Sequence, residues 1–271
     1  MNRNKKGFDQ MDNRGIKGKV ALVTGAAQGI GEAVTRSFVE HGVSVAAVDR
    51  NGDRLAALVS DLQSNGYDVH AFPADVANSA EIDEIVAQIE DKMGPIEILV
   101  NVAGILRTGF IESFTDEDWE EVFKVNTTGV FNVSRSASRR MIPRRSGAIV
   151  TVSSNAATVP RMFMSAYAAS KAAATMFTKC LGLELAQYHI RCNVVSPGST
   201  ETEMQRAMWM DENGANKVIA GSMEEFRLGI PLKKMAQPSD IADAVLFLVS
   251  EQSRHITMHD LRVDGGATLD S

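Results

Sequence analysis

Short apolar runs alternate with longer amphipathic stretches along most of the chain. From residue 19 onward, runs rich in Val, Ile and Ala are separated by stretches whose apolar positions recur with a helical period. Continuous apolar strands alternating with helices indicate a parallel sheet covered on both faces, because neither face of such a strand meets water. The sequence therefore predicts one α/β domain with a single doubly wound, Rossmann-type parallel sheet. The predicted strands are 19–25, 43–49, 68–75, 96–104, 147–154, 191–198 and 260–266, and the predicted helices are 29–41, 51–65, 79–93, 116–142, 163–187 and 238–250.

Two segments do not follow this alternation. Residues 1–15 are polar and without periodicity, so we interpret them as a disordered leader before a single dinucleotide-binding and catalytic domain over 16–271. Residues 203–230 mix Met, Trp and Phe with charged side chains. For this segment two interpretations stay open: a helical pair packed on the core, or a substrate lid that closes over the site and excludes water.

Composition narrows the class of protein. The chain has 271 residues, a hydrophobic fraction of 44% and a formal net charge of -6, which argues against a nucleic-acid partner. No apolar run is long enough to cross a membrane, and the N-terminus lacks the apolar core of a secretion signal. Cys180 and Cys192 lie in apolar runs without metal-ligand spacing, so we expect buried thiols, no metal and a cytoplasmic location.

A glycine-rich turn, TGAAQGIG, joins the first predicted strand to the first predicted helix. Its glycines allow backbone N–H groups to approach a pyrophosphate at the helix N-terminus. Asp49 ends the second strand, where a carboxylate can accept hydrogen bonds from ribose hydroxyls and would repel a 2′-phosphate. This pattern favours NAD over NADP. Two alternatives stay open: Asp49 is a simple helix cap, or the adjacent Arg50 pairs with the extra phosphate of NADP.

Other chemically useful residues also follow predicted strands. Asp75, Asn101, Ser154 and Pro197 each end or follow one. In doubly wound sheets ligands bind beyond the carboxyl ends of the strands, near the switch in strand order. We therefore expect these residues to gather at one edge of the sheet.

Tyr167 and Lys171 are four residues apart in SAYAASKAAATM, so they leave the same face of a helix. Oxidising a carbinol requires a base for the hydroxyl proton. A free tyrosine is too protonated at neutral pH, but a nearby ammonium favours the phenolate, as does the positive ring of an oxidised nicotinamide. Ser154 can hydrogen-bond the substrate oxygen, and Asn126 can anchor a water that links Lys171 to solvent. The alternative is a tyrosine and a lysine on a surface helix by chance.

These motifs together resemble the short-chain dehydrogenase/reductase superfamily from about residue 19 to the C-terminus. The resemblance implies that Tyr167 is the acid/base, that Lys171 and Asn126 form its proton relay, and that Ser154 rather than Ser153 positions the substrate oxygen. The family's NNAG motif reads NVAG here. A homotetramer is also implied. The cofactor site implied by the resemblance comprises Gly25, Gln28, Gly29, Ile30, Gly31, Asp49, Asp75, Val76, Asn101, Ala103, Gly104, Tyr167, Lys171, Pro197, Gly198, Thr200 and Thr202.

More local stretches narrow the expected substrate. NVAGILRTG and the residues around Arg161 resemble superfamily members that oxidise a cyclohexadiene diol carboxylic acid with NAD in bacterial siderophore synthesis. A ring carboxylate calls for a cation, and our order of candidates is Arg161, Arg107 and Arg206, each of which could instead be a solvated surface arginine. The alternatives are another short-chain alcohol dehydrogenase, a 3-oxoacyl thioester reductase, or a dinucleotide-sensing binding module.

Overall fold

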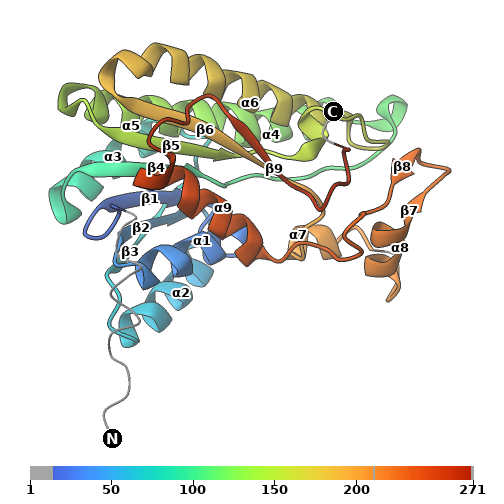
Figure 1. Cartoon of the computed structure of the whole chain (residues 1–271), viewed down its shortest axis with the longest axis horizontal. Coiled ribbons are helices and arrows are strands. Elements are labelled where there is room, and N and C mark those ends of the chain that lie inside the picture. The colour runs from blue at the N-terminus through green and yellow to red at the C-terminus, as the bar shows by residue number, and fades with distance from the viewer. Residues whose placement is uncertain (1–14, 210, 270–271) are drawn as a thin grey trace, which may run out of the picture.

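Seven parallel strands form one sheet in the order β3-β2-β1-β4-β5-β6-β9 in the computed structural model (Figure 1). The structure describes residues 15–209 and 211–269. Strand order runs outward in both directions from the β1/β4 pair, which creates a topological switch point there. The predicted doubly wound sheet is confirmed. The strands are β1 (Val20–Thr24), β2 (Ser44–Asp49), β3 (Val69–Pro73), β4 (Ile96–Asn101), β5 (Gly147–Val152), β6 (Ile190–Pro197) and β9 (Asp260–Val263).

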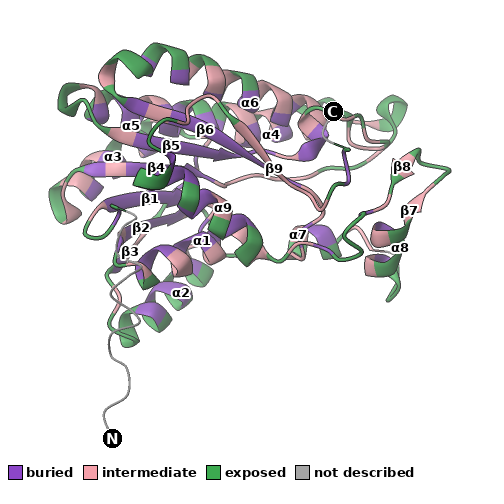
Figure 2. Cartoon of the chain, in the orientation of Figure 1, coloured by how far each residue is buried: buried purple, intermediate pink, exposed green. Residues whose placement is uncertain are grey.

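Helices cover both faces of this sheet, and each face has its own apolar core. Along β1, Ala21 and Val23 belong to one core, whereas Val20 and Leu22 belong to the other. Burial on both faces explains why the strands are continuously apolar, and Figure 2 shows them as the buried centre of the molecule. The first face is covered by α1 (Gly29–Glu40), α2 (Gly52–Ser64) and α9 (Pro238–Val249), and the second by α3 (Ser79–Met93), α5 (Val130–Arg144) and α6 (Ser165–Leu185).

The helix predicted over 116–142 is not continuous. It consists of α4 (Asp116–Phe123), a π-helical stretch over Lys124–Gly129, and α5. Such wide turns are uncommon and often occur at functional sites. Here the wide turn contains Asn126, which is fully buried. The apolar period continues through the irregularity, so the sequence pattern gave no sign of it.

The segment 203–230 is also different from a plain helical pair. It contains α7 (Glu203–Arg206), α8 (Gly214–Ala220) and an antiparallel hairpin of β7 (Gly221–Ser222) and β8 (Arg227–Leu228), drawn in orange in Figure 1. Val218 of this segment packs with Ile230, Met235 and Ala267 in a small apolar cluster of its own. Closure of the segment over a ligand stays a prediction.

Three further expectations concern the ends, the cysteines and the membrane. The predicted leader lies outside the described residues except for Gly15.

Cys192 is buried as expected, but the prediction was wrong for Cys180, which is exposed because it lies on the outer face of α6. Within the described part of the chain, no helix is both long and apolar enough to cross a membrane.

Candidate active site

The glycine-rich turn packs tightly against the loop after β4. Gly25 has a φ of +65°, and a Cβ there would lie 2.8 Å from backbone atoms of Ala103. A Cβ on Gly31 would overlap the carbonyl group of Gly25. Helix α1 begins at Gly29, and its N-cap residue Gln28 makes no side-chain cap hydrogen bond. The N–H groups of the first turn are thus left without a side-chain cap, and the cradle fits a pyrophosphate group.

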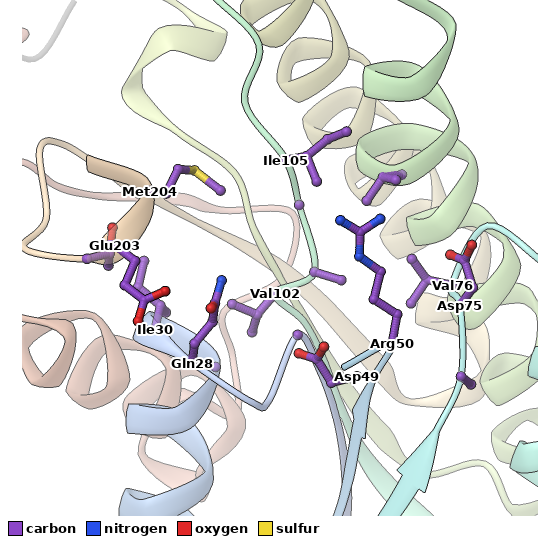
Figure 3. Close-up of a pocket in the computed structure, with 18 residues that line it drawn as sticks. Gln28, Ile30, Asp49, Arg50, Asp75, Val76, Val102, Ile105, Glu203 and Met204 are labelled. Atoms are coloured by element: carbon purple, nitrogen blue, oxygen red, sulfur yellow. The ribbon is translucent and has the colours of Figure 1, made fainter. Parts of the chain in front are cut away.

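A cleft extends from this turn between the ends of β2 and β4 (Figure 3). At the end of β2, Asp49 accepts hydrogen bonds from the N–H groups of Ala27 (3.0 Å) and Asn51 (2.9 Å), which hold its carboxylate at the edge of the cleft. Arg50 extends from the next position into the same cleft (Figure 3). The predicted cofactor residues that line this cleft are Gly25, Gln28, Gly29, Ile30, Gly31, Asp49, Asp75, Val76, Ala103, Gly104 and Thr202.

The predicted cofactor residue Asn101 does not line this cleft. It is buried, and its Nδ2 donates to the hydroxyls of Ser134 (3.0 Å) and Thr151 (3.4 Å). It therefore ties β4 to α5 and β5. A residue that the prediction omitted, Thr24, accepts hydrogen bonds from the N–H groups of Val102 and Ala103 and so fixes the NVAG loop against the glycine-rich turn.

Lys171 and Asn126 meet beside Gly104. A Cβ built on Gly104 would lie 3.2 Å from Asn126 Oδ1 and 3.3 Å from Lys171 Nζ. Asn126 is held there because Ile105 N donates to its Oδ1 (2.8 Å), while its Nδ2 donates to Ile105 O and Ser170 Oγ, both at 3.0 Å. The π-helical turn thus directs the Asn126 amide toward Ser170 in the N-terminal half of α6.

Tyr167 and Lys171 share one face of α6, as the spacing predicted. Lys171 Nζ lies 5.8 Å from the centre of the Tyr167 ring and donates to Val152 O at 3.0 Å. The Tyr167 side chain is hydrogen-bonded to that of Ser154. Ser153, by contrast, is engaged with the Lys171 carbonyl and Thr175 Oγ1. The structure therefore brings Ser154, Tyr167 and Lys171 together at the end of β5.

Burial dominates the electrostatics of this group. It raises the pKa of Tyr167, an effect that the hydrogen bond with Ser154 partly offsets. It also lowers the pKa of Lys171 to about 8. A phenolate at Tyr167 therefore needs nearby positive charge, which the protonated Lys171 can supply below that pH.

A second cavity opens beside the cofactor cleft and shares Ile30, Thr202 and Met204 with it. Ser154 and Tyr167 lie in its wall, so this cavity is the candidate substrate site. The predicted cofactor residues Pro197, Gly198 and Thr200 line this second cavity.

Of the three candidate arginines, only Arg161 lines the second cavity. Arg107 is exposed and paired with Asp118 (3.3 Å) and Glu121 (2.8 Å). Arg206 is exposed and paired with Glu201 at 3.0 Å. The lining also includes Arg227, which the sequence prediction missed.

The comparisons with known proteins agree with this geometry. The family model for short chain dehydrogenases matches residues 19–213. The chain belongs to the short-chain dehydrogenase family. It is 67% identical over 259 residues to the 2,3-dihydro-2,3-dihydroxybenzoate dehydrogenase of Bacillus subtilis, covering 96% of this chain and 99% of that one. It is 44% identical to the vibriobactin-specific enzyme of that name from Vibrio cholerae, covering 94% and 97%.

A solved structure of the same family has a similar fold. The gluconate 5-dehydrogenase from Burkholderia cenocepacia, crystallised with NADP and tartrate, superposes with a TM-score of 0.88 at 32% identity and covers 96% of this chain and 99% of that one. The predictions of a short-chain dehydrogenase and of an oxidoreductase enzyme are thus confirmed.

Burying Lys171 should make this short-chain dehydrogenase less stable. The pKa of Lys171 falls from 10.5 to about 8 on folding, so below pH 8 the cost of burying its charge is fully present. Between about pH 8 and 10.5 the unfolded chain binds more protons at this lysine than the folded chain does. The free energy of unfolding therefore rises with pH in this range, as the cost of burying the charge disappears. We expect Lys171→Met to increase the free energy of unfolding by about 2 kcal/mol at pH 7, even though activity is lost.

Urea unfolding of both proteins at pH 7 and pH 9.5 measures this effect, with Lys179→Met on the same helix as the control. The advantage of the Lys171→Met variant should shrink at the higher pH, because the wild-type lysine is then largely neutral in the folded state. A variant that is less stable than the wild type at pH 7 contradicts the prediction.

Proposed function

We propose that this enzyme oxidises 2,3-dihydro-2,3-dihydroxybenzoate to 2,3-dihydroxybenzoate with NAD, as a step of bacterial catecholate siderophore synthesis. The observation that carries the substrate is the 67% identity over 259 residues to the Bacillus subtilis enzyme of that name. The site supports it independently: a tyrosine base lies in a cavity that opens beside a dinucleotide cleft.

In this proposal each side chain of the catalytic group has one task. Tyr167 accepts the proton of a ring hydroxyl, and Ser154 holds that oxygen by a hydrogen bond. Lys171 supplies the positive charge that favours the phenolate, and Asn126 anchors a water beside Gly104 through which the proton leaves toward solvent. NAD held by the residues of the cleft would supply the acceptor for the hydride of the carbon that bears this hydroxyl. The resulting dienone enolises to the catechol, and aromatisation makes the oxidation strongly downhill.

The cofactor residues support NAD through charge. The Asp49 carboxylate stands at the cleft edge, where it suits ribose hydroxyls and opposes a phosphate. The cradle at Gly25, Gly29 and Gly31 serves the pyrophosphate, and Lys171 would also hold the nicotinamide ribose.

One assay separates the candidate functions. Purified enzyme is given NAD with the dihydrodiol acid, or NADPH with a β-ketoacyl thioester, and the change in NADH or NADPH absorbance is followed. Formation of NADH in the first mixture supports the proposal. Oxidation of NADPH in the second favours the thioester reductase, and dinucleotide binding without turnover in either favours a sensing module.

We also propose a homotetramer in the cytoplasm. The tetramer is supported by exposed apolar surface on α5 and α6, where Phe131, Met176 and Leu183 are 39%, 60% and 69% exposed. Light scattering coupled to size exclusion measures the mass directly, and a monomer at micromolar concentration contradicts the proposal.

A further inference from the structure

Two arginines from distant parts of the chain face the candidate substrate cavity. Arg161 lies in the loop that leads into α6, and Arg227 begins strand β8 of the hairpin in segment 203–230. Both side chains line the cavity whose wall also contains Tyr167 and Ser154. Both arginines are only partly exposed.

Neither guanidinium is neutralised within the described part of the chain, where no carboxylate comes within ion-pair distance of Arg161 or Arg227. Arg227 donates to Ser199 Oγ at 2.8 Å, which is a neutral partner. The charge of Asp264 attracts Arg161, but that carboxylate already accepts hydrogen bonds from Thr268 Oγ1 (2.8 Å) and Gly266 N (2.9 Å). Likewise, Glu225 attracts Arg227 without forming an ion pair with it.

The two positive charges oppose each other. Burial lowers the pKa of both arginines, and the charge of Arg227 lowers that of Arg161 further. Two half-buried like charges without a counter-ion are unfavourable in the free protein, and an anion placed between them would relieve that cost. Charges held in this way in a cleft are characteristic of a functional site.

The other residues that line the cavity indicate what kind of anion it would bind. Its lining includes the apolar side chains of Leu106, Met164, Met204 and Met208, which suit the faces of a flat ring. Tyr167 and Ser154, which carry hydroxyl groups, line the same cavity. A ligand that suits all these lining residues is a flat ring with a hydroxyl toward Tyr167 and a planar anion toward the arginines.

We propose that Arg161 and Arg227 together bind the substrate carboxylate, and that Arg227 is a specificity-determining residue of this enzyme. The identity of the substrate rests on the proposed function above. Because Ser199 follows β6 whereas Arg227 belongs to the hairpin, the hydrogen bond between them holds the Arg227 guanidinium beside the loop after β6. A bound carboxylate would therefore connect segment 203–230 with the loop before α6.

The test compares two substrates and several variants. Initial rates are measured with the dihydrodiol acid and with the corresponding cyclohexadiene diol that lacks the carboxylate. We expect Arg227→Ala and Arg161→Ala each to lower the ratio of kcat/KM for the acid to that for the neutral diol by about tenfold to a hundredfold. The KM for NAD should change much less, and Arg227→Lys should restore part of the ratio. Lys217→Ala, which removes an exposed positive charge from the same segment, is the control.

The outcomes separate this inference from the proposed function. If the wild type oxidises the acid but neither substitution changes the ratio, the carboxylate site is wrong and the function stands. If the wild type does not oxidise the acid, the proposed function fails, and the site is then judged by salicylate binding followed through Trp209 fluorescence. Binding that is lost in both arginine variants keeps the anion site, and binding that is unchanged in them overturns it. Circular dichroism and the melting temperature identify a variant that fails to fold, in which case Arg227→Gln and Arg161→Gln, which remove the charge but keep more of the side chain, replace it.

Discussion

Replacing Tyr167 with phenylalanine is expected to reduce kcat for oxidation of the dihydrodiol acid by about a thousandfold. Phenylalanine fills the same space in α6 but cannot accept the hydroxyl proton, and it removes the hydrogen bond with Ser154. Binding of NAD should be altered much less, because the glycine-rich turn and Asp49 are untouched. Steady-state rates of NADH formation measure the loss, and Tyr188→Phe, which removes a hydroxyl far from the cavity, is the matched control.

The pH profile distinguishes a proton-accepting role from a packing role. The hydrogen bond with Ser154 lowers the pKa of Tyr167 and so increases the phenolate fraction at a given pH. Removing that bond in Ser154→Ala raises the pKa, and the rising limb of kcat/KM against pH should move to higher pH. A Tyr167→Phe variant that keeps more than a tenth of wild-type turnover would show that another group takes the proton.

The fold could be predicted from the sequence because a sheet that is buried on both faces requires apolar residues along its strands. Strands covered on both faces are mostly apolar, as β1 is from Val20 to Val23, and such runs are visible in the sequence without knowledge of the tertiary structure. The glycine-rich turn and the Tyr167–Lys171 spacing are equally local. Each is fixed by a few consecutive residues and by the geometry of one element.

Features that depend on several distant segments could not be predicted in this way. The π-helical turn that directs Asn126 inward leaves the apolar period intact, so the helix over 116–142 looked continuous. Asn101 follows a strand, as a ligand residue would, yet its amide is used by Ser134 and Thr151. Arg227 belongs to a short hairpin with a weak sequence pattern, and its place in the cavity depends on a hydrogen bond with the distant Ser199.

The choice of cofactor is expected to change when the charge at Asp49 is removed. Asp49→Asn keeps an acceptor oxygen for the N–H groups of Ala27 or Asn51 but removes the negative charge that would oppose a 2′-phosphate. Because like charges brought together cost several kcal/mol, the ratio of kcat/KM for NAD to that for NADP should fall by about a hundredfold or more. Rates with both cofactors at saturating dihydrodiol acid measure this ratio.

Arg50 should determine how much NADP activity the Asp49→Asn variant gains. It is exposed, extends into the cleft beside Asp49, and can approach an added phosphate once the carboxylate charge is gone. The double variant Asp49→Asn/Arg50→Ala should therefore lose part of the NADP activity that the single variant gains, whereas Arg50→Ala alone should leave the preference for NAD in place. If Asp49→Asn retains the wild-type ratio, Asp49 serves only as the hydrogen-bonded end of β2, and the discrimination between the cofactors must come from another part of the cleft.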